Sequence, residues 1–263
     1  MKPQDAIRLP DLFSVSGKVA LITGGSSGMG EASARELAKR GWQVAIMFSK
    51  NKAQADRVAG DINGLALQGD VAQDADCRRA AKAVVDKWGR IDALVNSAGT
   101  TKFVAHGDLE GLSAEDILGI FRINLVGPYQ MIRACAAALK EAHGCVVNLS
   151  SVAARLGTGS SVAYAASKAA LDTMTLSLAR ALGPEVRLNV VAPGFVRTPW
   201  QIAAHGADGA AELERRFAER APLKAAAEAQ DAAETIAWLI ENARRVTGQI
   251  VYVDGGMHIA VPR

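Results

Sequence analysis

Short apolar segments alternate with longer amphipathic segments along the chain, from about residue 19 to residue 253. Each apolar segment is rich in Val, Ile, Leu and Ala, and a turn and a stretch with helical spacing follow it. Strands that are apolar on both faces are typical of a parallel sheet covered by helices. The pattern predicts an α/β fold with one doubly wound, Rossmann-like parallel sheet of seven strands and helices on both faces.

The predicted elements follow the chain in a regular order. Strands are expected at 19–22, 44–48, 65–67, 91–95, 145–149, 186–191 and 250–253. Helices are expected from the first glycine-rich turn to about 40, from about 52, at 74–88, in one long run from 113 to 141, at 162–182 and at 229–241. Ligands of such sheets bind beyond the carboxyl ends of the strands. The residues that follow each strand are therefore the candidate site.

Residues 198–224 form the longest stretch outside this rhythm. They are rich in Ala and contain the charged helical piece AELERRFAER. The segment could be a surface helix pair or a lid over the strand ends, and its position directly after the sixth strand favours the lid. No linker or repeat divides the chain, so we expect residues 1–263 to form a single dinucleotide-binding domain.

Composition and charge exclude several classes of protein. Hydrophobic residues make up 49% and charged residues 22% of 263 residues, which is typical of a globular chain and not of a disordered one. The net charge is only +3 and the basic residues are scattered, so no nucleic-acid partner is expected. No apolar run approaches the roughly 18 residues of a membrane span, and residues 1–18 do not resemble a signal peptide.

The cysteines and histidines point to a reducing compartment without a metal site. Cys77, Cys135 and Cys145 are widely spaced, which predicts buried free thiols and not disulfides. The four histidines show no ligand spacing, so no metal is assigned. We expect a cytoplasmic protein.

The turn between the first strand and the first helix has the sequence TGGSSGMG. At a helix start the N–H groups lack partners and the dipole favours an anion, while glycines let a pyrophosphate approach the backbone. A simple tight turn is the alternative. The turn predicts dinucleotide contacts from Gly24, Ser26, Ser27, Gly28 and Met29.

The end of the second strand bears on the choice of cofactor. An acid about 20 residues beyond the glycines would hold the ribose hydroxyl of NAD, but Phe48 stands there and no acid occurs from 43 to 55. Ser49, Lys50 and Asn51 could instead donate to a 2′-phosphate, which favours NADP(H) over NAD(H). In the alternative interpretation, Lys50 and Lys52 only begin a solvated helix.

A tyrosine and a lysine lie four residues apart in the segment YAASK, after the fifth strand. Tyr164 and Lys168 therefore share one helical face. Ser151 lies thirteen residues before Tyr164, at the exit of the strand VVNLSS.

Together these motifs resemble the short-chain dehydrogenase/reductase family over residues 18–257, in particular its 3-oxoacyl-acyl carrier protein reductase-like members. TGGSSGMG is similar to the family's TGxxxGxG, and residues 96–99 resemble its NNAG with Ser97 in place of the second Asn. The catalytic tetrad of the family is matched by Asn124, Ser151, Tyr164 and Lys168.

The resemblance also implies cofactor contacts and an assembly. Asp70 and Val71 would bracket the adenine, and Asn96 would hold the fourth strand to its neighbour. Ala98, Gly99, Tyr164 and Lys168 would line the cofactor, and its nicotinamide would be embraced by Pro193, Gly194, Val196 and Thr198. The family's helix pairing implies a homotetramer.

The implied activity is hydride transfer between NADP(H) and a carbonyl or secondary alcohol substrate, with Tyr164 as general acid/base. Free tyrosine titrates near 10, and a Lys ammonium about 5 Å away at an effective dielectric near 20 would supply roughly 3 kcal/mol toward the lower pKa this role needs. A non-catalytic nucleotide-binding sensor or scaffold of the same fold is the alternative. Candidate pocket residues are Thr101, Lys102, Phe103, Arg155, Leu156, Phe195, Val196 and Trp200.

Overall fold

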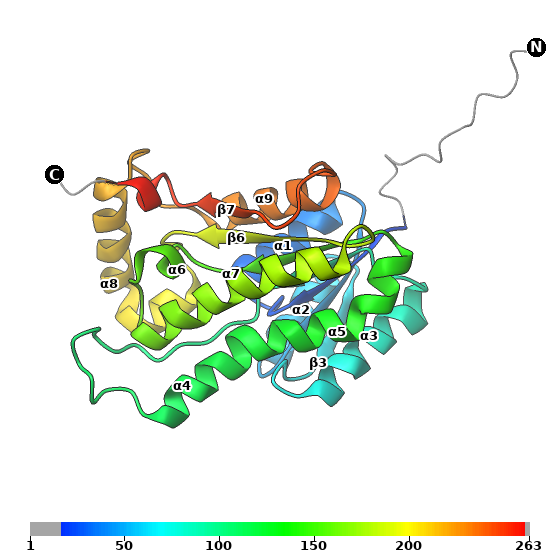
Figure 1. Ribbon diagram of the computed structural model, residues 1–263, viewed down its shortest axis with the longest axis horizontal. Helices are drawn as coiled ribbons and strands as arrows, with labels where there is room; N and C mark the ends of the chain where they lie inside the picture. Colours follow the sequence, from blue (N-terminus) through cyan, green and yellow to red (C-terminus); the bar gives the residue numbers. More distant parts are fainter. Residues whose placement is uncertain (1–16, 261–263) are drawn as a thin grey trace, which may run out of the picture.

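A parallel sheet of seven strands runs through the centre of the molecule in the computed structural model, which describes residues 17–260 (Figure 1). The strand order is β3-β2-β1-β4-β5-β6-β7, and every neighbouring pair is parallel. The strands are β1 (Val19–Thr23), β2 (Gln43–Phe48), β3 (Leu65–Gln68), β4 (Ala93–Asn96), β5 (Cys145–Leu149), β6 (Arg187–Pro193) and β7 (Ile250–Val253). This arrangement confirms the predicted doubly wound fold.

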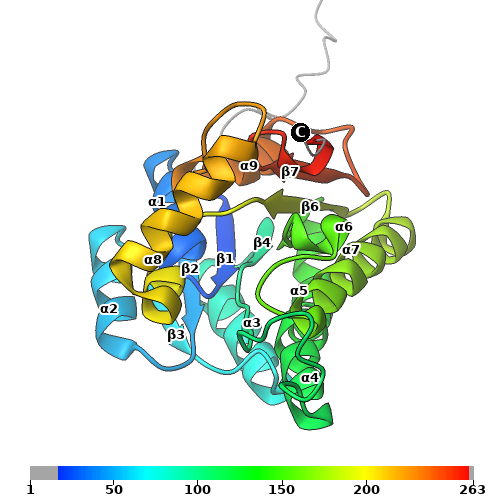
Figure 2. The same cartoon turned by 90° about the vertical axis from the view of Figure 1, so that its left-hand side faces the viewer.

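Helices cover both faces of the sheet (Figure 2). They are α1 (Gly28–Lys39), α2 (Lys52–Asp61), α3 (Asp74–Trp88), α4 (Ala114–Phe121), α5 (Gly127–Glu141), α6 (Ala153–Leu156), α7 (Val162–Leu182), α8 (Pro199–Arg220) and α9 (Ala229–Glu241). A short 3-10 helix, η2 (Met257–Ile259), follows β7. One core packs α1, α2 and α9 against the sheet, and a second core packs α3, α5 and α7 against the other face.

The strands are apolar throughout because both of their faces are buried. Successive residues of β1 enter opposite cores: Val19 and Leu21 face α3 and α5, while Ala20 and Ile22 face α1 and α9. All four residues are fully buried, with 0% of their surface exposed. A parallel sheet in this position leaves the strand ends, and not the faces, free to bind ligands.

The predicted long helix from 113 to 141 is confirmed in its extent, but it contains a π-helical turn that was not predicted. Ser113 caps α4 through a capping box with Asp116, but a π-helical turn, η1 (Arg122–Val126), separates α4 from α5. Pro128 has no N–H to donate to the carbonyl four residues earlier, which is that of Asn124. The interruption therefore falls at the residue that the family resemblance singled out.

Smaller differences concern the ends of elements. The fourth and sixth strands begin one or two residues later than predicted and extend to Asn96 and Pro193, and the short helix α6 was not predicted. Helix α8 accounts for most of residues 198–224, and its axis breaks at Gly206, where φ is 71°. The N-terminal residues 1–16, on which the prediction about a signal peptide rested, lie outside the described part.

Two further findings concern the cysteines and the hydropathy of the helices. Cys77, Cys135 and Cys145 are free and buried, as predicted, and burial raises the pKa of each thiol to about 11 or 12. Between residues 17 and 260, no helix combines the length and apolar character needed to cross a membrane.

Candidate active site

The glycine-rich turn joins β1 to α1 at the carboxyl edge of the sheet, and its glycines are required by close packing. A Cβ at Gly25 would lie 2.5 Å from Cγ2 of Ile46, and one at Gly30 would lie 2.3 Å from the carbonyl oxygen of Gly24. At Gly28, where φ is +55°, a Cβ would approach only the Thr198 side chain, at 3.5 Å. The turn is therefore tightly packed on the side that faces the core, and it has free space on the side that faces the segment after β6.

The start of α1 has donors available for an anion. Ser27 is the N-cap residue, yet its side chain makes no capping hydrogen bond. The first N–H groups of a helix have no partners within the helix, and the dipole there favours negative charge. The predicted contact residues Gly24, Ser26, Ser27, Gly28 and Met29 therefore surround bare backbone that fits a pyrophosphate.

Replacing Gly30 with Ala should destabilise this turn, because the new methyl group would meet rigid backbone and not a flexible side chain. We expect a loss of about 1–3 kcal/mol in the free energy of unfolding and weaker binding of NADPH. Urea unfolding and NADPH fluorescence titration measure the two effects. Gly60→Ala is the matched control, since nothing lies within 4 Å of its new Cβ on helix α2. Equal stability of both variants would contradict this account.

The residues after β2 present donors and no free carboxylate. Ser49, Lys50 and Asn51 are exposed, and Asn51 caps α2 by accepting a hydrogen bond from the N–H of Gln54 at 3.1 Å. Lys52 pairs with Asp56 on α2 at 2.5 Å. The Lys50 side chain has no ion pair or hydrogen bond among the described residues, so its ammonium is available.

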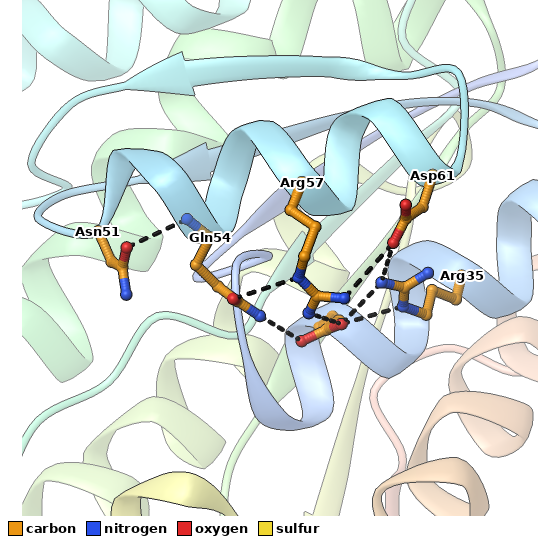
Figure 3. A network of polar contacts seen from close by, with 6 residues as sticks. Arg35, Asn51, Gln54, Arg57 and Asp61 are labelled. Atoms are coloured by element: carbon orange, nitrogen blue, oxygen red, sulfur yellow. Dashed lines mark hydrogen bonds and ion pairs between the residues drawn. The ribbon is translucent and has the colours of Figure 1, made fainter.

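An ionic network between α1 and α2 holds the beginning of α2 (Figure 3). Glu31, in the first turn of α1, accepts hydrogen bonds from Arg35, Arg57 and Gln54 at 3.0, 3.2 and 3.4 Å. Arg35 also donates to Asp61 at 2.8 Å. The carboxylate of Glu31 is already neutralised by two arginines and does not stand free beside the nucleotide-binding turn.

The segment after β3 is held by its own backbone contacts. The carboxylate of Asp70 accepts the N–H of Ala72 at 2.9 Å, and the N–H of Asp70 donates to Asp76 at 2.8 Å. Val71 is buried, and its carbonyl accepts from Gln130 of α5 at 2.7 Å. Asp70 is only half-buried, and its second carboxylate oxygen has no contact among the described residues.

Polar side chains tie the end of β4 to its neighbours. Nδ2 of Asn96 donates to Oδ1 of Asn148 in β5 at 2.8 Å. The hydroxyl of Thr23 in β1 accepts the N–H groups of Ser97 and Ala98, each at 3.1 Å. A Cβ at Gly99 would lie 3.7 Å from Nζ of Lys168, so this segment leads directly to the candidate catalytic residues.

Asn124 lies fully buried in the π-helical turn, and its side chain is completely engaged. Its Oδ1 accepts the N–H of Thr100 at 2.8 Å, and its Nδ2 donates to the Thr100 carbonyl at 2.9 Å and to Ser167 at 3.0 Å. The amide thus fixes the segment after β4 against α7. Its backbone carbonyl is the group that would accept the usual α-helical hydrogen bond from residue 128, which Pro128 cannot donate.

Ser151, Tyr164 and Lys168 converge at the carboxyl end of β5. Nζ of Lys168 donates to the carbonyl of Leu149 at 2.8 Å and lies 5.7 Å from the centre of the Tyr164 ring. Ser161 caps α7 by accepting the N–H of Tyr164 at 3.2 Å, which sets the phase of the helix. Tyr164 and Ser151 both line the adjacent cavity.

Burial governs the pKa values of this group. The dense protein surroundings raise the pKa of Tyr164 to about 12, although its side chain still reaches the cavity and a hydrogen bond with Ser151 opposes the rise. Burial lowers the pKa of Lys168 to about 8, against the attraction of Asp172 one turn further along α7. In the protein alone the pKa of the phenol is therefore raised and not lowered as expected, because burial outweighs the hydrogen bond with Ser151.

A cavity of about 730 Å³ opens beside Tyr164. Five of the predicted pocket residues line it, namely Phe103, Leu156, Phe195, Val196 and Trp200. The cavity does not include Thr101, Lys102 or Arg155, and Lys102 instead pairs with Asp116 at 2.7 Å. Of the predicted nicotinamide segment, Pro193, Gly194, Val196 and Thr198 all line the cavity, and so does Met29 from the glycine-rich turn.

Several lining residues were not predicted from the sequence, and α8 contributes six of them. These six are Gln201, His205, Leu213, Arg216, Phe217 and Arg220. The others are Val104 and Ala105 after β4, Met257 after β7, and Ser150, Val152, Ala153, Thr158, Gly159 and Ser160 between β5 and α7. The four residues 213, 216, 217 and 220 have the spacing of one helical face, and this spacing can be recognised in the sequence. The direction of that face depends on how α8 packs, which the spacing alone does not reveal.

Comparisons with known proteins identify the family of the chain. A family model described as enoyl-(acyl carrier protein) reductase matches residues 24–258. The chain is 36% identical over 243 residues to a candidate ketoacyl reductase of the granaticin polyketide synthase of Streptomyces violaceoruber, covering 92% of this chain and 96% of that protein.

Two solved structures share the fold over nearly their whole length. One is a candidate short-chain dehydrogenase/reductase of Burkholderia xenovorans, with 37% identity, a TM-score of 0.84, and coverage of 94% of this chain and 100% of that one. The other is a 3-ketoacyl-(acyl-carrier-protein) reductase of Brucella melitensis complexed with NADH, with 31% identity, a TM-score of 0.83, and coverage of 93% and 100%.

Proposed function

Because the chain belongs to the short-chain dehydrogenase/reductase family and is an NAD(P)-dependent oxidoreductase of keto or alcohol substrates, we propose that it uses NADP(H) and that Tyr164 is its general acid/base. The observation that carries the proposal is that Ser151 and Tyr164 line one cavity together with Met29 of the glycine-rich turn, while Nζ of Lys168 lies 5.7 Å from the centre of the Tyr164 ring. The test is consumption of NADPH or NADH with a panel of ketones, and oxidation of the matching alcohols.

In the proposed mechanism each side chain has one task. When held beside Pro193, Gly194, Val196 and Thr198, the nicotinamide of the cofactor would supply or accept the hydride. Tyr164 donates its phenolic proton to the carbonyl oxygen as negative charge develops there, and its raised pKa of about 12 keeps it protonated at neutral pH. Ser151 donates a hydrogen bond to the same oxygen and orients the carbonyl.

Lys168 serves Tyr164 by its charge and its position. Its ammonium lies 5.7 Å from the phenol ring, where it stabilises a phenolate once the proton has left. Alcohol oxidation needs this phenolate, and a cationic nicotinamide would add to the same stabilisation. Asn124 holds the segment from Gly99 to Thr100 beside Lys168, and this packing helps to keep the lysine next to Tyr164.

The proposed preference for NADP(H) depends on the residues after β2. Exposed Ser49 and Lys50 and the side-chain N–H groups of Asn51 could bind a 2′-phosphate, and Glu31 is neutralised by arginines. The relative from Brucella melitensis is complexed with NADH, so the preference is a property to be tested in this chain itself.

Lys50→Ala should weaken NADPH binding about tenfold and leave NADH binding nearly unchanged, because only the 2′-phosphate would lose a partner. Fluorescence titration with the two cofactors side by side measures the effect. Lys52→Ala is the matched control, since Lys52 is already paired with Asp56. A wild-type preference for NADH would overturn the cofactor proposal and leave the catalytic residues untouched.

Helix α8 is proposed to act as the substrate lid within a single dinucleotide-binding domain. It begins at Pro199, directly after the predicted nicotinamide segment, and both of its halves line the cavity. The break at Gly206 gives the two halves different directions. Homotetramer assembly and a cytoplasmic location remain predictions from the sequence.

A sensor or scaffold that binds the nucleotide without turnover is the alternative function. Its signature would be tight cofactor binding with no cofactor consumption across the whole panel of ketones and alcohols. The complete set of four residues favours the enzyme: Ser151 and Tyr164 line the cavity, Lys168 lies beside the Tyr164 ring, and Asn124 donates a hydrogen bond to Ser167 on the same helix. The four-residue spacing of Tyr164 and Lys168 favours carbonyl over enoyl reduction.

A further inference from the structure

We propose that the part of the cavity lined by Arg216 and Arg220 of α8 binds an anionic group, a carboxylate or a phosphate, carried by the carbonyl substrate. This inference rests on the proposed function, because it names the class of substrate that the same cavity takes. The substrate would present its carbonyl to Tyr164 and its anionic end to the two arginines.

The charge of the cavity wall is the first argument. Among the described residues that line the cavity, Arg216 and Arg220 are the two that carry a full charge at neutral pH, and no aspartate or glutamate lines it. The rest of the wall is apolar, aromatic or neutral. An anion entering this cavity would meet two guanidinium groups and no repelling carboxylate on its wall.

The second argument is that packing places the face of α8 that carries these two exposed arginines at the cavity. Phe217 lies between them in sequence, and its ring is so close to Gly194 that a Cβ there would lie 2.4 Å from the ring. The same ring lies 6.4 Å from that of Phe195. This contact anchors the second half of α8 against the exit of β6. Arg216 and Arg220, four residues apart, share one side of the anchored helix.

The donors of Arg220 are free. Arg216 donates to Glu212 at 2.6 Å, and Glu212 also pairs with Arg215. The guanidinium of Arg220 makes no hydrogen bond or ion pair with any other residue in the described range 17–260. The helix dipole favours a cation in the last turn of α8, where Arg220 lies, and this interaction uses none of the five N–H donors of the guanidinium. A planar guanidinium with unused donors at a cavity wall suits a carboxylate or phosphate.

The aromatic side chains indicate the rest of the substrate. The Tyr164 and Trp200 rings are 6.0 Å apart, Trp200 and Phe103 are 6.1 Å apart, and Phe103 and His205 are 4.8 Å apart, all edge to face. This chain of rings forms a continuous wall that begins at the reacting phenol. The cavity of about 730 Å³ exceeds the need of a small ketone. A substrate with an apolar or aromatic body between its carbonyl and its anion fits both features.

The test compares two pairs of ketones that differ only in charge. The first pair is 4-acetylbenzoate and its methyl ester, and the second is acetoacetyl-pantetheine 4′-phosphate and acetoacetyl-pantetheine. We expect the wild-type kcat/KM to favour the anionic member of at least one pair about tenfold or more. The first pair reports a carboxylate and the second a phosphate. In Arg220→Gln this ratio should fall toward one, whereas the exposed Arg155, outside the cavity, provides the control Arg155→Gln, which should keep it.

A wild-type ratio near one in both pairs would overturn the anion site, and so would an equal loss in Arg155→Gln and Arg220→Gln. If the wild-type protein reduces no ketone with either cofactor, the proposed function fails separately. Calorimetric binding of 4-acetylbenzoate and its methyl ester to the same variants then decides the anion site. Tighter binding of the acid that depends on Arg220 would support the site, and equal binding of acid and ester would overturn it.

Discussion

Tyr164→Phe is expected to lower the rate of hydride transfer by about a hundredfold or more, because it removes the only phenolic proton at the cavity edge described here and retains the ring. The Phe ring keeps the packing against Trp200 at 6.0 Å, so the cavity should keep its shape. Steady-state consumption of NADPH with the best ketone of the panel measures the loss. NADPH fluorescence titration should show that the cofactor still binds.

The control for this prediction is Tyr129→Phe. Tyr129 lies on α5, is 44% exposed, and does not line the cavity. The control removes the same hydroxyl from a surface position and should leave turnover unchanged. Unchanged turnover in Tyr164→Phe would show that another group donates the proton.

Lys168→Met is expected to lower hydride transfer by a comparable factor and also to change how stability depends on pH. In the folded protein the pKa of Lys168 is about 8, below the ordinary value of 10.5, because the ammonium is buried. Between pH 8 and pH 10 the unfolded chain therefore holds a proton that the folded chain releases. The free energy of unfolding of the wild type should rise over this range, relative to the variant, by roughly 2–3 kcal/mol.

Urea unfolding of both proteins at pH 7 and pH 10 measures this difference. At pH 7 the variant also loses the hydrogen bond from Nζ to Leu149, which offsets part of its gain from burying a methionine. Lys140→Met, at an exposed position near the end of α5, is the control and should show no such pH-dependent difference. Parallel pH profiles for wild type and Lys168→Met would mean that the buried ammonium is solvated in the folded protein.

Local patterns in the sequence were enough for the elements and for much of the candidate site. The glycine-rich turn between an apolar strand and an amphipathic helix identified the nucleotide-binding edge. The four-residue spacing of Tyr164 and Lys168 placed them on one face of α7, where the structure brings them together. These features depend on a few neighbouring residues, so a short stretch of sequence is enough to predict them.

The π-helical turn and the cavity face of α8 could not be predicted from local sequence patterns. The long helix from 113 to 141 has continuous helical periodicity, and only Pro128 marks the π-helical turn at Asn124. The cavity residues of α8 have a clear helical spacing, but the face they present depends on the contact of Phe217 with Gly194. The residues that make this contact are far apart in sequence, so local periodicity carries no information about it.

The sequence by itself determined the parallel sheet, the order of its elements and the identity of the polar groups at its carboxyl edge. Backbone sterics and apolar periodicity act over a few residues and are written directly in the chain. The tertiary structure alone decided that the pKa of Tyr164 rises to about 12 and that Arg216 and Arg220 reach the cavity. Desolvation and helix orientation are sums over atoms from distant segments, and those atoms meet only in the folded protein.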